Sequence, residues 1–295
     1  MLIPSGLSDE PTGYALSLIL QSCIQNQVGS AHPDPLHLSA HFLQPTRTSS
    51  FEVHLRILKR GRNFINIIAD LVQENHTCIT AHLIFGKIPP SSPPIKGYTR
   101  RHPLVGHPSN AIVSESPKAF GFGHRVRWAE DPDPLFQNET NSPIRNQKIG
   151  GLAVWSAWLE LVDPEDRLTL ASLSLFADCV KNVALLFPAS VTGVDPNNLW
   201  LPTLSFSLEY KTPIPPPSAL HSARTVGVYV FSGFLSEPQG RHDTYVEIWT
   251  APSNIGEGSE VEGWRDAQVC LGIATQMQLI VKGTVNTKAA AKSSL

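Results

Sequence analysis

"FEVHLRILKRGRNFINIIADLVQENHTCITAHLIFG", residues 51 to 86, contains three apolar runs separated by two polar turns. In the first run Phe51, Val53 and Leu55 alternate with polar residues, which is the period of a strand with one buried face. The next two runs, 64–72 and 78–85, have the length of ordinary strands. Because short turns join the three runs, the sequence predicts an antiparallel sheet here.

Basic residues gather in the same stretch and raise the question of a phosphate-binding site. Arg56 lies on the polar side of the first strand, and Lys59, Arg60 and Arg62 fall at the turn after it. Polar residues on the outer side of an antiparallel sheet are normal, so we interpret this cluster as a solvated face. A groove for a phosphorylated ligand is the alternative. The formal charge of the whole chain is −2, which argues against a nucleic-acid partner.

A helix precedes this sheet, and the pattern then repeats. Residues 12–27 have apolar positions at helical spacing. A proline-rich linker is expected at 89–118. Beyond it, residues 163–187 predict a second long helix, with Asp163 as the N-cap and Pro188 as the stop. Further strands are expected at 124–128, 152–162, 203–212, 225–235, 244–251 and 267–281.

Each half of the chain thus combines a long helix with an antiparallel sheet. This pattern predicts an α+β fold, the double hotdog, in which each helix is wrapped by its sheet and the two sheets join into one. We expect an N-terminal hotdog domain over 1–88, the linker over 89–118, a C-terminal hotdog domain over 119–283 and a flexible tail over 284–295.

The four cysteines, Cys23, Cys78, Cys179 and Cys270, are far apart and form no CxxC pair. They predict neither a disulfide framework nor a zinc site, so the cytoplasm is the expected compartment. The final tripeptide, Ser293-Ser294-Leu295, is similar to the peroxisomal S-K-L signal, which makes the peroxisome the alternative.

The sequence predicts no metal centre and no membrane span. On a strand His37 and His41 would lie about 13 Å apart, which is too far to share one ion. No window of the sequence reaches the roughly 18 apolar residues that a membrane span needs.

Three further motifs carry a family resemblance. "HFLQPTRTSSFEVHLRILKRGRNF", residues 41 to 64, is similar to a signature in which an F-L-x-P turn precedes a strand and an R-x-G-x-x-F turn, here with shorter spacing. "LPTLSFSLEY" (201–210) and "IATQMQLIV" (273–281) are similar to strands of the second domain. The chain therefore resembles fungal thioesterase-like proteins of the acyl-CoA thioesterase II (TesB-like) family over residues 10–88 and 119–283. The first domain of that family opens with a strand before its helix. Because only about ten residues precede the helix here, the resemblance implies that this first strand is missing or that the chain is shortened.

The resemblance implies a catalytic set of one Asp, one Thr and one Gln, which match Asp178, Thr203 and Gln276. A carboxylate can orient a water molecule and accept its proton, while a hydroxyl and an amide fix the water's other hydrogen bonds. A backbone N–H at a helix N-terminus could stabilise the oxyanion. Each residue alone is an ordinary structural residue, whereas their order along the chain favours function.

The resemblance implies hydrolysis of an acyl-CoA or acyl-carrier-protein thioester without a cofactor. One alternative keeps the scaffold but uses it for product release or cyclisation in a polyketide-type pathway. Another alternative is a non-catalytic acyl-binding protein, because fold does not determine function. Assembly into a homo-oligomer stays open.

Overall fold

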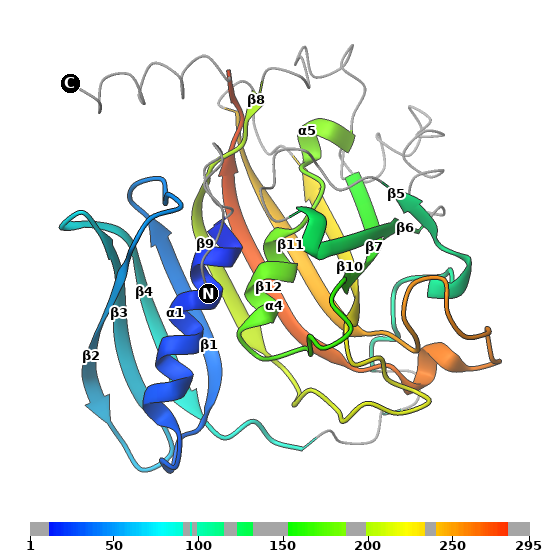
Figure 1. Ribbon diagram of the computed structural model, residues 1–295, viewed down its shortest axis with the longest axis horizontal. Coiled ribbons are helices and arrows are strands. Elements are labelled where there is room, and N and C mark those ends of the chain that lie inside the picture. Colours follow the sequence, from blue (N-terminus) through cyan, green and yellow to red (C-terminus); the bar gives the residue numbers. More distant parts are fainter. Residues whose placement is uncertain are drawn as a thin grey trace.

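A single antiparallel sheet of eleven strands forms the centre of the protein (Figure 1). The computed structural model describes residues 12–90, 95, 99–114, 123–131, 153–186, 199–233 and 240–282. The strand order in the sheet is β2-β3-β4-β1-β9-β12-β11-β10-β7-β6-β5. The expected joining of two sheets into one is therefore confirmed.

The elements follow the chain in two groups. The first group is α1 (Thr12–Gln27), β1 (Asp34–Phe42), β2 (Glu52–Arg60), β3 (Ile65–Gln73) and β4 (His76–Gly86). The second is β5 (Ile112–Ser114), β6 (Val126–Glu130), β7 (Ala153–Leu161), α4 (Ser172–Asp178), α5 (Val183–Leu186), β9 (Thr203–Tyr210), β10 (Thr225–Gly233), β11 (Arg241–Thr250) and β12 (Cys270–Leu279). Strands β8 (Leu199–Trp200) and β13 (Val281–Lys282) form a separate pair, and three short 3₁₀ turns lie at Pro108–Asn110, Gly123–Arg125 and Trp264–Ala267.

The two halves meet where β1 pairs with β9, with Ser39 directly opposite Ser207. Outward from this seam the orders β1-β4-β3-β2 and β9-β12-β11-β10 mirror each other. Strand β7 lies beyond β10, and the described part of the first half has no strand in the equivalent place. The prediction of a missing first strand concerns residues 1–11, which are outside the described residues.

Helices α1 and α4 pack against each other on one face of the sheet (Figure 1). Leu16, Ile19, Leu20 and Cys23 form the buried stripe of α1, and all four are fully buried. Gly29 follows the helix with φ of 73°, a left-handed conformation that glycine adopts without strain. The helix therefore ends before this residue, close to the predicted boundary at residue 27.

The prediction of one long helix over 163–187 is wrong. The side chain of Asp163 does accept a hydrogen bond from the Glu165 N–H (2.9 Å), but it closes a turn that does not continue as a helix. Helix α4 begins later, where Thr169 and Ser172 cap each other's backbone N–H groups, and it ends at Asp178, with Cys179 as its C-cap. The segment after it contacts the sheet, where Nδ2 of Asn182 donates to Oε1 of Gln278 (3.0 Å), and such tertiary contacts override local helix propensity.

Strand β1 and the linker also differ from expectation. The sequence predicts three strands in the first half, and β1 is a fourth; its buried residues Leu38 and Ala40 alternate with half-buried ones. Part of the linker packs against the sheet, because His102 and Leu104 are buried and His102 stacks on Trp158 of β7. The linker also contributes β5, which pairs with β6.

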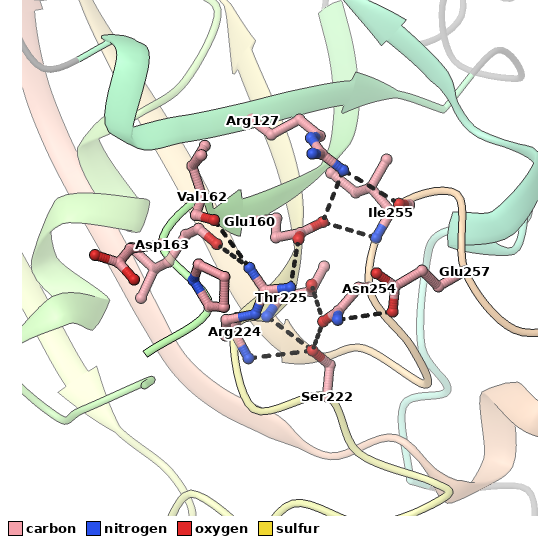
Figure 2. Close-up of polar contacts among 12 residues, drawn as sticks. Arg127, Glu160, Val162, Asp163, Ser222, Arg224, Thr225, Asn254, Ile255 and Glu257 are labelled. Atoms are coloured by element: carbon pink, nitrogen blue, oxygen red, sulfur yellow. Dashed lines mark hydrogen bonds and ion pairs between the residues drawn. The ribbon is translucent and has the colours of Figure 1, made fainter. Parts of the chain in front are cut away.

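The buried carboxylate of Glu160 connects three segments near one end of the sheet (Figure 2). The Glu160 side chain on β7 is 2% exposed and lies 3.1 Å from the guanidinium of Arg224. It also accepts a hydrogen bond from the Ile255 N–H (2.8 Å), and Arg127 lies 3.8 Å away. The loop after β11 is therefore fixed to β7 and to the start of β10, because a buried charge has to be paired.

Candidate active site

The carboxylate of Asp178 lies at the N-terminus of α1. Asp178 is the last residue of α4, it is half-buried, and its Oδ2 accepts a hydrogen bond from the Gly13 N–H (2.8 Å). A methyl group on Gly13 would lie 2.5 Å from the Ser174 carbonyl oxygen and would overlap the Asp178 side chain. Glycine therefore permits the close approach of the two helices. The partial positive charge of the helix N-terminus stabilises a carboxylate there.

Gln276 on β12 is fixed beside Asp178. Its side chain is buried, and its Nε2 donates to the carbonyl oxygen of Ala177 (2.7 Å), the residue before Asp178. Its Oε1 accepts a hydrogen bond from Nε2 of Gln278 (2.8 Å). The structure thus brings Asp178 and Gln276, two of the three expected residues, to one place.

Thr203, the third expected residue, is separated from Gln276 by the side chain of Gln278. It is the first residue of β9, is buried, and lies directly opposite Gln278 in the register of β9 and β12. Its Oγ1 lies 3.4 Å from Nε2 of Gln278. Thr203 is therefore linked to Gln276 through Gln278. The catalytic roles of Asp178, Thr203 and Gln276 remain predictions.

Gln278 is the central residue that sequence reasoning missed. Its Oε1 accepts hydrogen bonds from Nδ2 of Asn182 (3.0 Å) and from Oγ1 of Thr244 (3.1 Å). A signal for it was present in the sequence: Gln276 and Gln278 are two residues apart on a strand, so both point toward the same face. Two amides on a core face need polar partners.

A buried histidine completes the cluster. His242 on β11 is 2% exposed, and its Nε2 lies 3.0 Å from Nδ2 of Asn182. Burial lowers the pKa of His242, while the Gly240 carbonyl, the Gln278 amide and the charge of Asp243 act in the opposite direction. Burial thus favours the neutral form of the His242 ring.

The thiol of Cys179 is next to Asp178 in the sequence but is poorly suited to act as a nucleophile. Cys179 is fully buried, and burial together with the Asp178 charge raises the pKa of this thiol well above its usual range. The thiolate is the reactive form of cysteine. The chemistry of this site therefore rests on its carboxylate, hydroxyl and amides.

A surface hollow of about 610 Å³ lies on the other face of the sheet. Thr275 and Met277, the outward-pointing neighbours of Gln276, line it together with Ser205 and Ser207 of β9. Gln276 also borders it, whereas Asp178 and Thr203 do not. Gln276 therefore lies between this hollow and the Asp178 side of the candidate active site.

The basic turn after β2 is far from Asp178. The carbonyl oxygen of Arg62 lies 3.1 Å from Nε2 of His32, which follows the C-terminal end of α1. Asp178 contacts the opposite end of this 16-residue helix, and at 1.5 Å per residue the two ends are about 24 Å apart. Arg56, Lys59, Arg60 and Arg62 are all exposed, as a solvated face would be.

Metal-binding clusters and disulfides are both absent from the described residues. These residues contain no group of three or more His, Cys, Asp or Glu side chains that could hold a metal ion. All four cysteines are free thiols. None of the helices in the described ranges has both the length and the apolar character needed to cross a membrane.

Comparisons with known proteins agree with the fold described above. Residues 12–86 match the family model described as "Acyl-CoA thioesterase N-terminal domain". No curated protein matches the chain. Three solved structures are similar to it over nearly their full length: a protein from Thermobifida fusca assigned as a thioesterase II, a hotdog-fold protein of unknown function from Alicyclobacillus acidocaldarius, and the acyl-CoA thioesterase II TesB2 from Mycobacterium marinum.

The structural similarity is close and the sequence similarity is low. The Thermobifida protein has a TM-score of 0.67 at 19% identity, with 95% of this chain and 89% of that chain covered. The Alicyclobacillus protein has a TM-score of 0.63 at 14% identity, with 95% of this chain and 90% of that chain covered. The Mycobacterium protein has a TM-score of 0.58 at 13% identity, with 92% of this chain and 89% of that chain covered.

These comparisons confirm the hotdog fold. The family match over residues 12–86 supports the expected relation to the thioesterase family for the first half of the chain. The fungal source and the TesB-like type II assignment of the whole chain remain predictions. Substrate and chemistry have to be argued from the site itself.

Proposed function

We propose that this protein hydrolyses an acyl thioester by means of a water molecule held by Asp178, Thr203 and Gln276. The observation that carries the proposal is the position of Asp178. Its carboxylate lies at the N-terminus of α1, and the Gln276 amide is hydrogen-bonded to the carbonyl of the preceding residue. The family match of the first half to an acyl-CoA thioesterase domain supports the same reaction.

In the proposed reaction Asp178 acts as the general base. A carboxylate has two oxygens and about four acceptor positions, so it can hold the Gly13 N–H and still accept the proton of a water molecule. The water oxygen forms a bond to the thioester carbonyl carbon, and negative charge develops on the carbonyl oxygen. The N-terminus of α1 favours negative charge nearby. When the C–S bond breaks, the proton held by Asp178 passes to the departing thiolate.

The remaining parts of the proposal concern carrier, assembly and compartment. We infer that the carrier is CoA or an acyl carrier protein, because both present the acyl group as a thioester. Assembly into a homo-oligomer is compatible with the proposal. We place the protein in the cytoplasm, with the peroxisome as the alternative; the tail that suggests it, residues 284–295, is outside the described residues.

A non-catalytic acyl-binding role is the second candidate. One observation favours it: Gln276, Gln278 and Thr203 form hydrogen bonds to one another and to the backbone, so their polar groups have structural uses. Asp178 likewise serves as a cap of α1. Product release or cyclisation on the same scaffold is a third candidate function, and the experiment below distinguishes it from the other two.

The test is a panel of short-, medium- and long-chain acyl-CoAs incubated with the protein in water enriched in oxygen-18. Hydrolysis predicts release of free thiol and an acid that carries one labelled oxygen. A cyclic product without the label would indicate cyclisation. Saturable binding of an acyl-CoA without thiol release would indicate the acyl-binding role and would contradict the proposal.

A further inference from the structure

Three buried amides form a chain of hydrogen bonds that all point in one direction. Nδ2 of Asn182 donates to Oε1 of Gln278 (3.0 Å), and Nε2 of Gln278 donates to Oε1 of Gln276 (2.8 Å). Nε2 of Gln276 then donates to the Ala177 carbonyl (2.7 Å). We refer to Asn182, Gln278 and Gln276 as the amide relay. Each member is at most 5% exposed.

The end of the relay at Ala177 sets its direction. A backbone carbonyl can only accept a hydrogen bond, so Gln276 has to point its NH₂ group toward Ala177. Oε1 of Gln276 then faces Gln278, so Gln278 has to donate from its NH₂ group. Oε1 of Gln278 in turn faces Asn182, so Asn182 also has to donate. Thr244 supports this direction, because its hydroxyl donates to the same oxygen of Gln278 that Asn182 does (3.1 Å).

His242 meets the relay at its other end. Nδ2 of Asn182 has two hydrogens, and the second points to Nε2 of His242 (3.0 Å). Nε2 must therefore be an acceptor, which places the ring proton on Nδ1. That nitrogen faces the Gly240 carbonyl, a pure acceptor, at 3.4 Å. The contacts of the two ring nitrogens thus both favour the Nδ1–H tautomer of neutral His242.

We propose that His242 is a positioning residue that acts through the amide relay on the site around Asp178 and makes this site sensitive to pH. The proposal rests on the proposed function. A proton on Nε2 of His242 would point at the NH₂ group of Asn182. Two donors facing each other in a buried site are unfavourable, so Asn182 would have to turn its oxygen toward His242.

Reversal of Asn182 would propagate along the relay. The oxygen of Asn182 would then face Oε1 of Gln278, and Gln278 would have to rotate its amide group. That rotation would bring Oε1 of Gln278 against Oε1 of Gln276. Gln276 would rotate in turn, and its oxygen would oppose the Ala177 carbonyl next to Asp178. The position of Gln276 beside Asp178 therefore depends on the protonation state of a histidine that is three hydrogen bonds away.

The surroundings of His242 favour its neutral form. The groups that face it from α5, its preceding turn and β12 are the amides of Asn182 and Gln278, which are uncharged. Among the described residues the nearby charge is Asp243, its neighbour on β11, which raises the pKa of His242. Burial is the larger effect and lowers this pKa. We therefore expect His242 to take up a proton at a lower pH than an exposed histidine does.

The first test does not require activity. In the full chain labelled uniformly with nitrogen-15, long-range proton–nitrogen spectra report which ring nitrogen of a histidine carries the proton, and the glutamine side-chain amides are seen in the same sample. We expect the Nδ1–H tautomer for His242 at neutral pH. The side-chain amide signals of Gln276 and Gln278 should shift as His242 titrates. An Nε2–H tautomer, or amide signals that do not respond, would overturn the inference even if the protein has no thioesterase activity.

The second test uses the pH profile of kcat. In the wild type kcat should fall as the pH decreases through the lowered pKa of His242. His242→Gln keeps an acceptor toward Asn182 but cannot be protonated, so it should retain activity within about threefold and lose this fall. His242→Leu removes the acceptor and should lower kcat by about tenfold or more at all pH values. Identical profiles for the wild type and His242→Gln would overturn the inference, whereas absence of turnover in every form would count only against the proposed function.

Discussion

The backbone N–H of Gly13 donates a hydrogen bond to the carboxylate of Asp178 across 2.8 Å, although the two residues are 165 positions apart in the chain. This contact joins the first helix of one half to the last residue of a helix in the other half. A negative charge at the N-terminus of a helix is favourable in any protein. The same contact therefore has a structural use and, in the proposed reaction, a catalytic one.

Gly13→Ala should disrupt this contact. The added methyl group would lie 2.5 Å from the Ser174 carbonyl and would overlap Asp178, so α1 and α4 would have to move apart. We expect a loss of about 1–3 kcal/mol in the free energy of unfolding and a lower kcat. Ser22→Ala on the same helix is the control, with an expected change within about 0.5 kcal/mol. Equal stability of the two variants in urea unfolding would show that the helices do not need this glycine.

Thr203→Val should lower kcat with little effect on stability. Valine has the shape of threonine but lacks the hydroxyl that faces Gln278 at 3.4 Å. If Thr203 helps to hold the attacking water, kcat should fall by about tenfold or more. Thr203→Ser retains a hydroxyl and should remain close to the wild type. Steady-state kinetics check this, and wild-type kcat in the valine variant would remove Thr203 from the proposed site.

Glu160→Ala should destabilise the protein without changing its chemistry. The change would leave the Arg224 guanidinium, with a side chain 14% exposed, and the Ile255 N–H without their shared acceptor (Figure 2). Removing one partner of a buried ion pair costs about 3–5 kcal/mol. The matched control is Glu209→Ala, because Glu209 is 56% exposed in its pair with Lys211 and such pairs contribute at most about 1 kcal/mol. Similar unfolding midpoints for both variants would contradict the role of Glu160.

The double change Arg60→Glu and Arg62→Glu should leave KM for acyl-CoA unaltered. Both residues are exposed, and their turn lies at the end of α1 opposite to Asp178. The interpretation as a solvated face predicts a change in KM of less than about twofold and little dependence on salt. A KM that rises sharply in the variant, and in the wild type with added salt, would support the alternative phosphate-binding groove.

The sequence predicted most strands because each has its own alternation of buried and outward residues. β1 was missed because it follows a turn-rich segment and its core face includes the small residue Ala40. The second helix was predicted too long because helix propensity is local. The contacts of Asn182 with Gln278 and His242 come from distant strands, and they accompany the break after α4.

The candidate site could be predicted in part for a similar reason. The family resemblance pointed to Asp178, Thr203 and Gln276. The structure places Gln276 beside Asp178 and links Thr203 to Gln276 through Gln278, without testing their roles. The pattern could not separate Gln276 from Gln278, because both point to the same face of β12. Their different partners become visible only in the fold: Gln276 contacts the Ala177 carbonyl, whereas Gln278 contacts Thr203.

The measurement that tests the central claim most directly is the kcat of Asp178→Asn for acyl-CoA hydrolysis, taken together with its unfolding free energy. Asparagine retains an oxygen that can accept the Gly13 N–H, so stability should stay within about 1 kcal/mol of the wild type. It cannot act as a general base, so kcat should fall by about 100-fold or more. A stable Asp178→Asn variant with wild-type kcat would show that Asp178 only caps α1 and would contradict the proposed mechanism.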